Sequence, residues 1–137
     1  MIQPVATFSV FIVKNLNSEK EFYTSHFGFN VAFENEWYLH LISETGIQVG
    51  FMLPNQPTQP TFFQPHFEGD GVILSLEVND ADSAYKYAQE NAFNVVLELK
   101  SEEWGQRHFV LEDPNGVHVD VLQETEPSSE YQDGYEK

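Results

Sequence analysis

The residues best suited to chemistry lie in the C-terminal third of the chain, where histidine and acidic side chains alternate with valines. Residues 104–123 read WGQRHFVLEDPNGVHVDVLQ, two alternating runs joined by Asp-Pro-Asn-Gly at 113–116. That tetrapeptide predicts a hairpin turn, because proline presets a turn dihedral and Asn-Gly tolerates positive φ. In the second run the valines point to one face, while His118 and Asp120 point to the other. We therefore expect one packed face and one face that offers an imidazole and a carboxylate.

Composition sets the class of protein that carries these residues. The chain has 137 residues, of which 41% are apolar, so it can form one domain with a sizeable core. Its formal charge of −16 argues against nucleic acid or an anionic membrane as a partner and is compatible with a cationic ligand. No basic segment precedes the apolar run 8–13, which is far too short to span a bilayer. We expect a soluble cytoplasmic protein.

The chain contains one structural unit twice. Residues 13–18 recur in type as 78–83, and Phe-Asn-Val at 29–31 recurs at 93–95. Each copy shows an alternating run, a helical pattern and three further alternating runs, which predicts a βαβββ order. The expected strands are 8–13, 29–34, 37–43, 47–53, 73–78, 94–99, 106–112 and 117–123.

Two helices are expected between these strands, each with a recognisable start. Asp80 is the predicted N-cap of the second helix. In the first helix, Ser18 and Glu21 have the spacing of a capping box. The fold class is therefore α+β, a single domain of two tandem βαβββ modules at about 5–53 and 71–123.

The remaining segments are a connector and a tail. Residues 54–70 hold four of the seven prolines and form a semi-stiff connector. Its three phenylalanines either pad the edge of the core or cover a pocket as a lid. The acidic tail 124–137 is expected to fray, although Tyr131 and Tyr135 offer rings that could dock on a partner.

Paired units with these motifs resemble the vicinal-oxygen-chelate superfamily, which includes glyoxalase I, extradiol dioxygenases and bleomycin and fosfomycin resistance proteins. The resemblance covers Val5 to Gln123 and rests on motifs at 22–29, 78–82 and 104–116. The motif at 104–116 is most similar to that of the bleomycin-resistance branch, with Trp-Gly, Arg and Phe ahead of Asp-Pro-x-Gly. The resemblance implies a homodimer whose cupped mixed sheets, with helices on their outer faces, enclose a small-molecule site.

The resemblance also implies where a metal ion would bind. The metal-using branches place ligands on the first and last strand of each unit, which here fall on Phe8, Gly50, Ile73 and Asp120. Of these side chains only the carboxylate of Asp120 can donate an electron pair, whereas a catalytic ion needs about three protein donors. We therefore expect no metal and no other cofactor.

What the resemblance then leaves is a pocket of mixed character. Small-molecule pockets are mostly apolar or aromatic with a few fixed polar groups, as the inward-facing residues are by strand parity. The candidate ligand-binding residues are Phe8, Tyr38, His40, Gln48, Met52, Ser75, Trp104, His108, His118 and Asp120.

Several of these residues have alternative interpretations. Trp104 either stacks on a planar or cationic ligand or shields a sheet edge. The histidines are more often wall residues than catalysts; if any acts as an acid or base, His118 with Asp120 is the preferred pair. Arg107 is expected in a salt bridge, and the glutamates at 102–103 in solvent.

Three classes of function follow. The leading interpretation is a metal-free protein that binds a cationic or planar, antibiotic-like small molecule. The alternative is a lyase, an isomerase or a divergent metal-dependent enzyme of the same superfamily. A third is an interaction module whose pocket is filled by its own side chains, such as Phe8 and Ile73.

Overall fold

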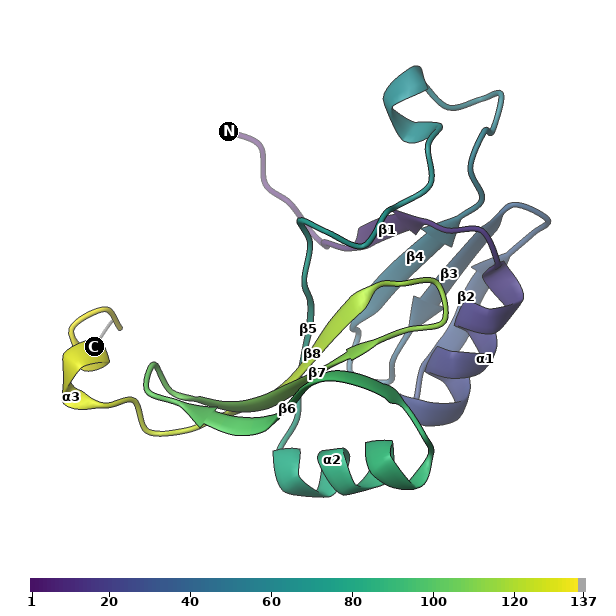
Figure 1. Ribbon diagram of the computed structural model, residues 1–137. Helices are drawn as coiled ribbons and strands as arrows, with labels where there is room; N and C mark the ends of the chain where they lie inside the picture. Colours follow the sequence, from purple (N-terminus) through teal and green to yellow (C-terminus); the bar gives the residue numbers. More distant parts are fainter. Residues whose placement is uncertain (136–137) are drawn as a thin grey trace. The chain divides into compact units, whose positions relative to one another are not determined.

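The computed structural model describes residues 1–135 of the chain. The chain divides into two compact units, Met1–Glu68 and Gly69–Lys137, and the boundary falls inside the predicted connector. Figure 1 shows one sheet and one long helix in each unit. Among the described residues, none of the helices has the length and apolar character needed to cross a bilayer.

The first unit has the predicted βαβββ order. Its elements are β1 (Ser9–Ile12), α1 (Leu16–His26), β2 (Asn30–Glu34), β3 (Tyr38–Ile42), β4 (Gln48–Met52) and η1 (Thr61–Phe63). The sheet has the order β1-β4-β3-β2, in which β1 and β4 are parallel and the other pairs antiparallel.

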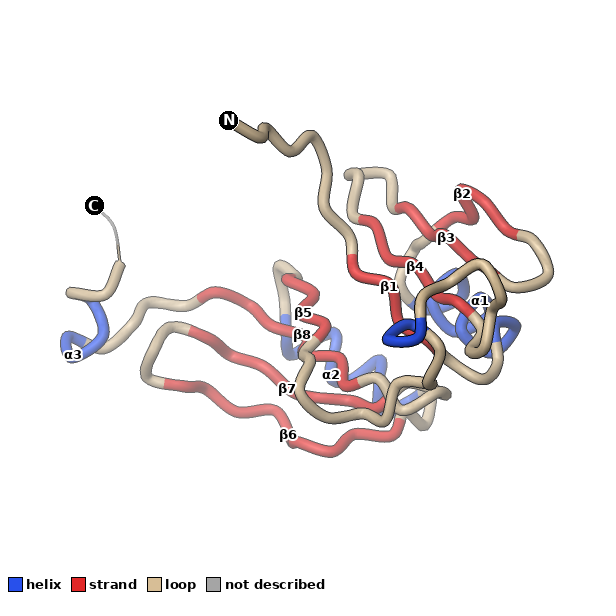
Figure 2. The backbone as a smooth tube through the Cα atoms, turned by 90° about the horizontal axis from the view of Figure 1, so that it is seen from above, coloured by secondary structure: helices blue, strands red, loops and turns tan. Residues whose placement is uncertain are grey.

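The second unit repeats this topology. Its elements are β5 (Leu74–Glu77), α2 (Ala81–Glu90), β6 (Asn94–Glu102), β7 (Gln106–Glu112), β8 (His118–Glu124) and α3 (Ser129–Gln132). The sheet order is β5-β8-β7-β6, again with a parallel pair, β5 and β8, and Figure 2 shows β6, β7 and β8 side by side. The α+β class and the tandem mixed sheets are therefore confirmed.

Alternation along the strands builds a core between each sheet and its helix. In the first unit Tyr23 of α1 stacks on Phe51 of β4, with ring centroids 5.4 Å apart. In the second unit Tyr85 of α2 meets Phe109 of β7 edge to face at 5.2 Å. The valines of the 117–121 run are fully buried, as the alternation predicted. Each buried side chain of this size contributes roughly 1.5–3 kcal/mol.

The turn and cap predictions fare differently. The hairpin at 113–116 is confirmed: Gly116 has φ 86°, and Asp113 Oδ1 accepts from the backbone N–H of Val117 at 2.9 Å. Asp80 caps α2, accepting from the Ser83 N–H at 3.1 Å. In α1 the expected capping box is wrong, because the helix begins earlier and Asn15 is its N-cap.

Strand β6 is longer than predicted. It extends to Glu102 instead of ending at residue 99, and its pairing with β7 shifts register between Val95 and Leu97 and again between Leu97 and Lys100. Such irregularities interrupt the alternation of side chains, which is why the pattern understated the strand. Because of this extension, the acidic residue Glu102 belongs to the strand.

The phenylalanines of the connector differ in their positions: one packs on the core, one lines a cavity and one is exposed. Phe67 pads the core: its N–H donates to the Ile12 carbonyl at 2.6 Å and its ring lies 5.4 Å from that of Phe11. Phe63, in η1, lines a cavity on the sheet. Phe62 remains largely exposed.

The described part of the tail makes hydrogen bonds back to its own unit, and whether it frays stays a prediction. The N–H of Thr125 donates to the Gly105 carbonyl, and that of Ser128 to the Glu103 carbonyl, both at 2.8 Å. The Tyr135 hydroxyl donates to the Trp104 carbonyl. Figure 1 shows α3 beside the turn between β6 and β7.

Candidate functional site

A cavity lies on the face of the first sheet that is turned away from α1. Its volume is about 260 Å³, and it is bounded by β1, β3, β4 and the connector. Leu39 and Leu41 of β3 are buried in the core, so their neighbours in the strand point to the cavity side. The lining residues, none of them charged, are Val10, Ile12, Trp37, Tyr38, Met52, Gln59 and Phe63.

A chain of hydrogen bonds begins at Tyr38. Tyr38 Oη lies 2.8 Å from His40 Nδ1, and His40 Nε2 lies 2.7 Å from Gln48 Oε1. Because an amide oxygen only accepts, Nε2 carries the proton and donates to Gln48. When the imidazole is neutral, Nδ1 accepts, and the Tyr38 hydroxyl donates to it.

Gly50 makes room for this Tyr38–His40–Gln48 chain. A Cβ atom at position 50 would lie 2.5 Å from Tyr38 Oη and 3.0 Å from Val10 Cγ2, so the phenol occupies the space of a missing side chain. The ring of Phe8 meets His40 edge to face at 4.6 Å. Burial raises the pKa of Tyr38, so its hydroxyl stays neutral at physiological pH.

The second unit holds a different polar group, the His108 cluster of Glu102, His108 and Asp120. His108 Nδ1 lies 2.8 Å from Asp120 Oδ1, and Nε2 lies 2.8 Å from Glu102 Oε2. Lys100 Nζ is 3.3 Å from the other oxygen of Glu102. The imidazole is buried, with a side-chain exposure of 8%.

The neighbouring charges favour the protonated form of the His108 imidazole. Burial by itself lowers the pKa of His108, but the hydrogen bonds and charges of Glu102 and Asp120 outweigh it and raise that pKa above its ordinary value. The hydrogen bond from His108 in turn lowers the pKa of Glu102. Both ring nitrogens therefore donate to carboxylates, and neither is free to take up a proton or a metal ion.

The structure pairs Asp120 with His108 instead of His118. His118 Nδ1 lies 2.8 Å from the Gly69 carbonyl, and its Nε2 lies 3.9 Å from Glu112. Ser75 is exposed on β5 and stands opposite Asp120 in the strand register. The preferred acid–base pair of the sequence thus does not form a hydrogen-bonded unit.

Trp104 lies at the turn between β6 and β7. The residue is 39% exposed, and its ring lies 6.3 Å from the His108 ring and 6.4 Å from the Tyr131 ring, centroid to centroid. It is held between the cluster and the tail. A ligand can reach only the part of the indole that these neighbours leave open.

The ten predicted residues therefore form two groups. In the first unit Phe8, Tyr38 and Gln48 each contact His40. Met52 pairs with Tyr38 and lines the cavity. His108, Asp120 and Trp104 gather in the second unit, with Ser75 opposite Asp120 and His118 apart from them.

Sequence reasoning missed Glu102 and Trp37. Glu102 was expected in solvent, yet its side chain is 14% exposed and bonds His108. Trp37 was not among the predicted ligand-binding residues, and it lines the cavity together with Phe63.

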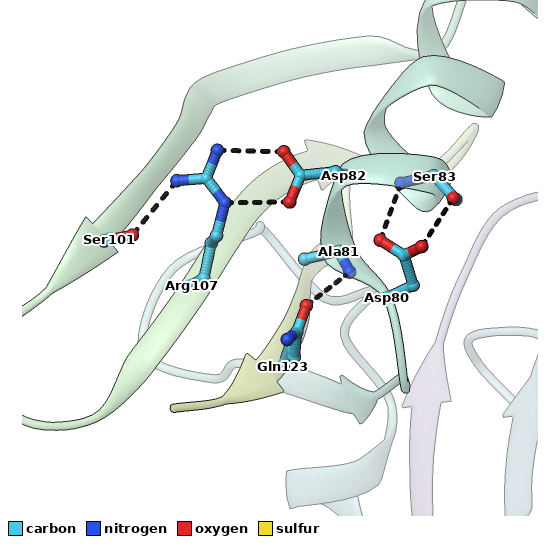
Figure 3. A network of polar contacts seen from close by, with 7 residues as sticks. All are labelled: Asp80, Ala81, Asp82, Ser83, Ser101, Arg107 and Gln123. Atoms are coloured by element: carbon cyan, nitrogen blue, oxygen red, sulfur yellow. Dashed lines mark hydrogen bonds and ion pairs between the residues drawn. The ribbon is translucent and has the colours of Figure 1, made fainter. Parts of the chain in front are cut away.

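The salt bridge predicted for Arg107 is confirmed. Its guanidinium donates to both oxygens of Asp82, at 3.0 and 2.9 Å, and also to Ser101. This pair lowers the pKa of Asp82 and raises that of Arg107. Figure 3 shows the network tying the start of α2 to β6 and β7, so Arg107 has a structural role.

The residues present do not suit a catalytic divalent ion. Three of the four positions that the resemblance assigned to metal ligands are Phe8, Gly50 and Ile73, which supply no side-chain donor. Within residues 1–135, no group of three or more histidine or acidic side chains is arranged to hold a metal. Asp120, the remaining position, is bonded to His108.

Comparison with protein families identifies the fold. The model of the Glyoxalase/Bleomycin resistance protein/Dioxygenase superfamily matches residues 4–121. The chain belongs to this superfamily. A comparison with curated proteins gives no match.

Several solved structures share the architecture. A glyoxalase/bleomycin resistance protein/dioxygenase from Nocardioides has a TM-score of 0.76 and 16% identity, covering 92% of this chain and 87% of that one. A member from Sphaerobacter thermophilus has a TM-score of 0.72 and 22% identity, with coverage of 90% and 100%. A virulence protein from Salmonella typhimurium has a TM-score of 0.72 and 15% identity, with coverage of 91% and 100%. At these identities the likeness establishes the fold alone.

Proposed function

We propose that this superfamily member is a metal-independent protein that binds a small molecule in the cavity of the first unit. The observation that carries the proposal is the uncharged, aromatic-lined hollow on the sheet face, next to the fixed Tyr38–His40–Gln48 chain. Apolar walls with a few oriented polar groups are the usual composition of a ligand site.

Size limits the ligand. Drug-sized molecules occupy pockets of roughly 300–1,000 Å³, and this cavity of about 260 Å³ lies just below that range. It therefore takes a compact molecule or one ring-bearing portion of a larger one. An antibiotic-like ligand, as the bleomycin-resistance branch would imply, places only one of its groups here.

Metal independence and dimerisation belong to the same proposal. The donor-poor positions Phe8, Gly50 and Ile73 support binding without a chelated ion, since apolar groups cannot replace its ligands. The homodimer rests on the family resemblance. Phe8 and Val10, which are 48% and 40% exposed, are apolar side chains that a second copy or a ligand would cover.

A thermal-shift screen with a cavity-filling variant tests the proposal. Cationic and planar aromatic compounds should raise the melting temperature of the chelator-treated chain through ligand linkage. Val10→Trp fills the cavity and should abolish the shift. Ser75→Trp, at the matching register position of the second unit, is the control and should retain it. Equal shifts in both variants, or no shift with any compound, would refute the site.

An enzymatic function is the second candidate, and the His108 cluster is the observation that favours it. A histidine held protonated between two carboxylates can act as a proton donor. We rank this function second because the His108 ring is buried and both of its nitrogens already bond carboxylates. Metal content measured on protein purified without chelators, together with a change in ligand structure on incubation, would reverse the order.

A further inference from the structure

We infer that the first-unit cavity selects a protonated amine carried on an apolar or aromatic body, and that Tyr38 Oη accepts a hydrogen bond from its N–H. The inference rests on the proposed function and names the ligand class of that site.

The direction of the Tyr38–His40–Gln48 chain sets what Tyr38 offers to a ligand. Gln48 Oε1 fixes the proton on His40 Nε2, so Nδ1 takes the proton of the Tyr38 hydroxyl. With its single proton committed to His40, Tyr38 Oη has only lone pairs left. A ligand must therefore donate to this oxygen, and one that can only accept is disfavoured.

The walls of the cavity suit a positive charge on that donor. Trp37, Tyr38 and Phe63 contribute aromatic rings to a lining of seven residues. Aromatic faces attract ammonium groups within about 6 Å of the ring centre. The apolar side chains of Val10 and Ile12 leave the rest of the space for a hydrocarbon or aryl portion.

Long-range charge favours the same ligand. The chain has a formal charge of −16, so a cation is attracted and an anion repelled before contact. No Lys or Arg lines the cavity to compensate an anion. The preference for cations should therefore weaken, without reversing, as salt is raised.

Three probes of one shape separate these contributions. They are 2-phenylethylammonium, its N,N,N-trimethyl analogue and 2-phenylethanol, titrated calorimetrically into the full-length chain. The first offers a charge and N–H donors, the second a charge only, and the third a neutral donor. We expect the primary ammonium to bind about tenfold more tightly than either of the others, because a hydrogen bond from a charged donor is the strongest contact available.

A substitution that removes only the phenolic oxygen tests whether Tyr38 causes the preference for the primary ammonium. Tyr38→Phe keeps the ring and removes the oxygen, so it should weaken the primary ammonium about tenfold and leave the trimethyl analogue nearly unchanged. Phe63→Leu should weaken both cations alike, by about two- to fivefold. Tyr85→Phe, in α2 of the second unit, also removes a single hydroxyl; it is the matched control and should alter none of the titrations.

The outcomes distinguish the inference from the proposal beneath it. Equal binding of all three probes, or an unchanged primary-ammonium affinity in Tyr38→Phe, overturns the inference while the binding site stands. Binding of none of the probes or of the wider compound screen overturns the proposed function. The comparison of probes in the wild-type chain does not depend on any variant folding.

Discussion

The two units share one topology and use matching positions in opposite ways. Tyr38 pairs with Met52 in the first unit, as His108 pairs with Leu122 in the second. The position across the parallel pair is Gly50 in one unit and Asp120 in the other, opposite Val10 and Ser75.

The residue at this position therefore distinguishes a neutral hydrogen-bonded chain in the first unit from an ion-paired cluster in the second. Without a side chain at Gly50, the Tyr38 phenol reaches across β4 and forms a neutral chain beside the cavity. With a carboxylate at Asp120, the equivalent space holds an ion pair with a buried imidazole. The duplicated fold thus supplies one uncharged surface, which we propose binds the ligand, and one charged cluster whose members bond one another.

Breaking the cluster should have the largest effect on stability. Asp120→Ala leaves the buried His108 with one partner, and we expect a loss of about 1.5–3 kcal/mol in the free energy of unfolding. Asp120→Asn keeps an oxygen acceptor without the charge and should lose less. Urea unfolding measures both, and equal costs for the two variants would show that the charge contributes nothing.

Filling the gap in the first unit should abolish its specificity at lower cost. Gly50→Ala places a methyl group 2.5 Å from Tyr38 Oη, so the phenol must move away from His40. We expect about 1 kcal/mol of destabilisation and at least a tenfold loss of primary-ammonium affinity. Calorimetric titration tests this; an unaltered affinity would mean that the chain does not orient Tyr38.

The units should also differ in their response to pH. The His108 pKa is raised from 6.5, so its contribution to stability is complete below that value and is lost as pH rises through the folded pKa. The Glu102 pKa is lowered from 4.5, so its contribution is complete above that value and is lost as pH falls through the folded pKa. The cluster is thus most stabilising between pH 4.5 and 6.5.

Unfolding of the wild type and of His108→Gln, followed across pH, tests this window. The difference in free energy between them should be greatest inside it and shrink on both sides. A difference independent of pH would contradict the protonated state of His108. Tyr38→Phe is the control, since it leaves the cluster intact.

The smallest expected effect concerns the tail. Tyr135→Phe removes the hydrogen bond to the Trp104 carbonyl, which should cost about 0.5–1.5 kcal/mol locally and increase the exposure of the indole. In a Trp37→Phe background Trp104 is the single tryptophan. Its emission should shift to longer wavelength, and an unshifted spectrum would mean that the tail does not cover it.

Most of the fold could be predicted from local sequence patterns. The Asp-Pro-Asn-Gly turn, the alternating valines after it and the Asp80 cap each follow from residue type and spacing, because turn dihedrals and side-chain parity are local properties. The start of α1 was misplaced because two polar residues offer competing caps, and Asn15 precedes the predicted Ser18.

The site was harder to predict, since its contacts depend on strand register. Asp120 could be placed on the inward face from parity, but its choice of His108 over His118 depends on how β7 pairs with β8. Likewise, the space at Gly50 is taken up by the phenol of Tyr38, which lies on β3 two residues before His40, the partner of Gly50 in the strand register. The place of Glu102 in β6 could not be predicted because register shifts in that strand interrupt the alternation of side chains.

The most direct test is calorimetric titration of 2-phenylethylammonium into chain freed of metal by chelation, with elemental analysis of the same sample. We predict saturable binding at one site per chain, with an affinity unchanged when divalent ions are returned. Binding that appears only after a divalent ion is added would contradict a metal-independent site.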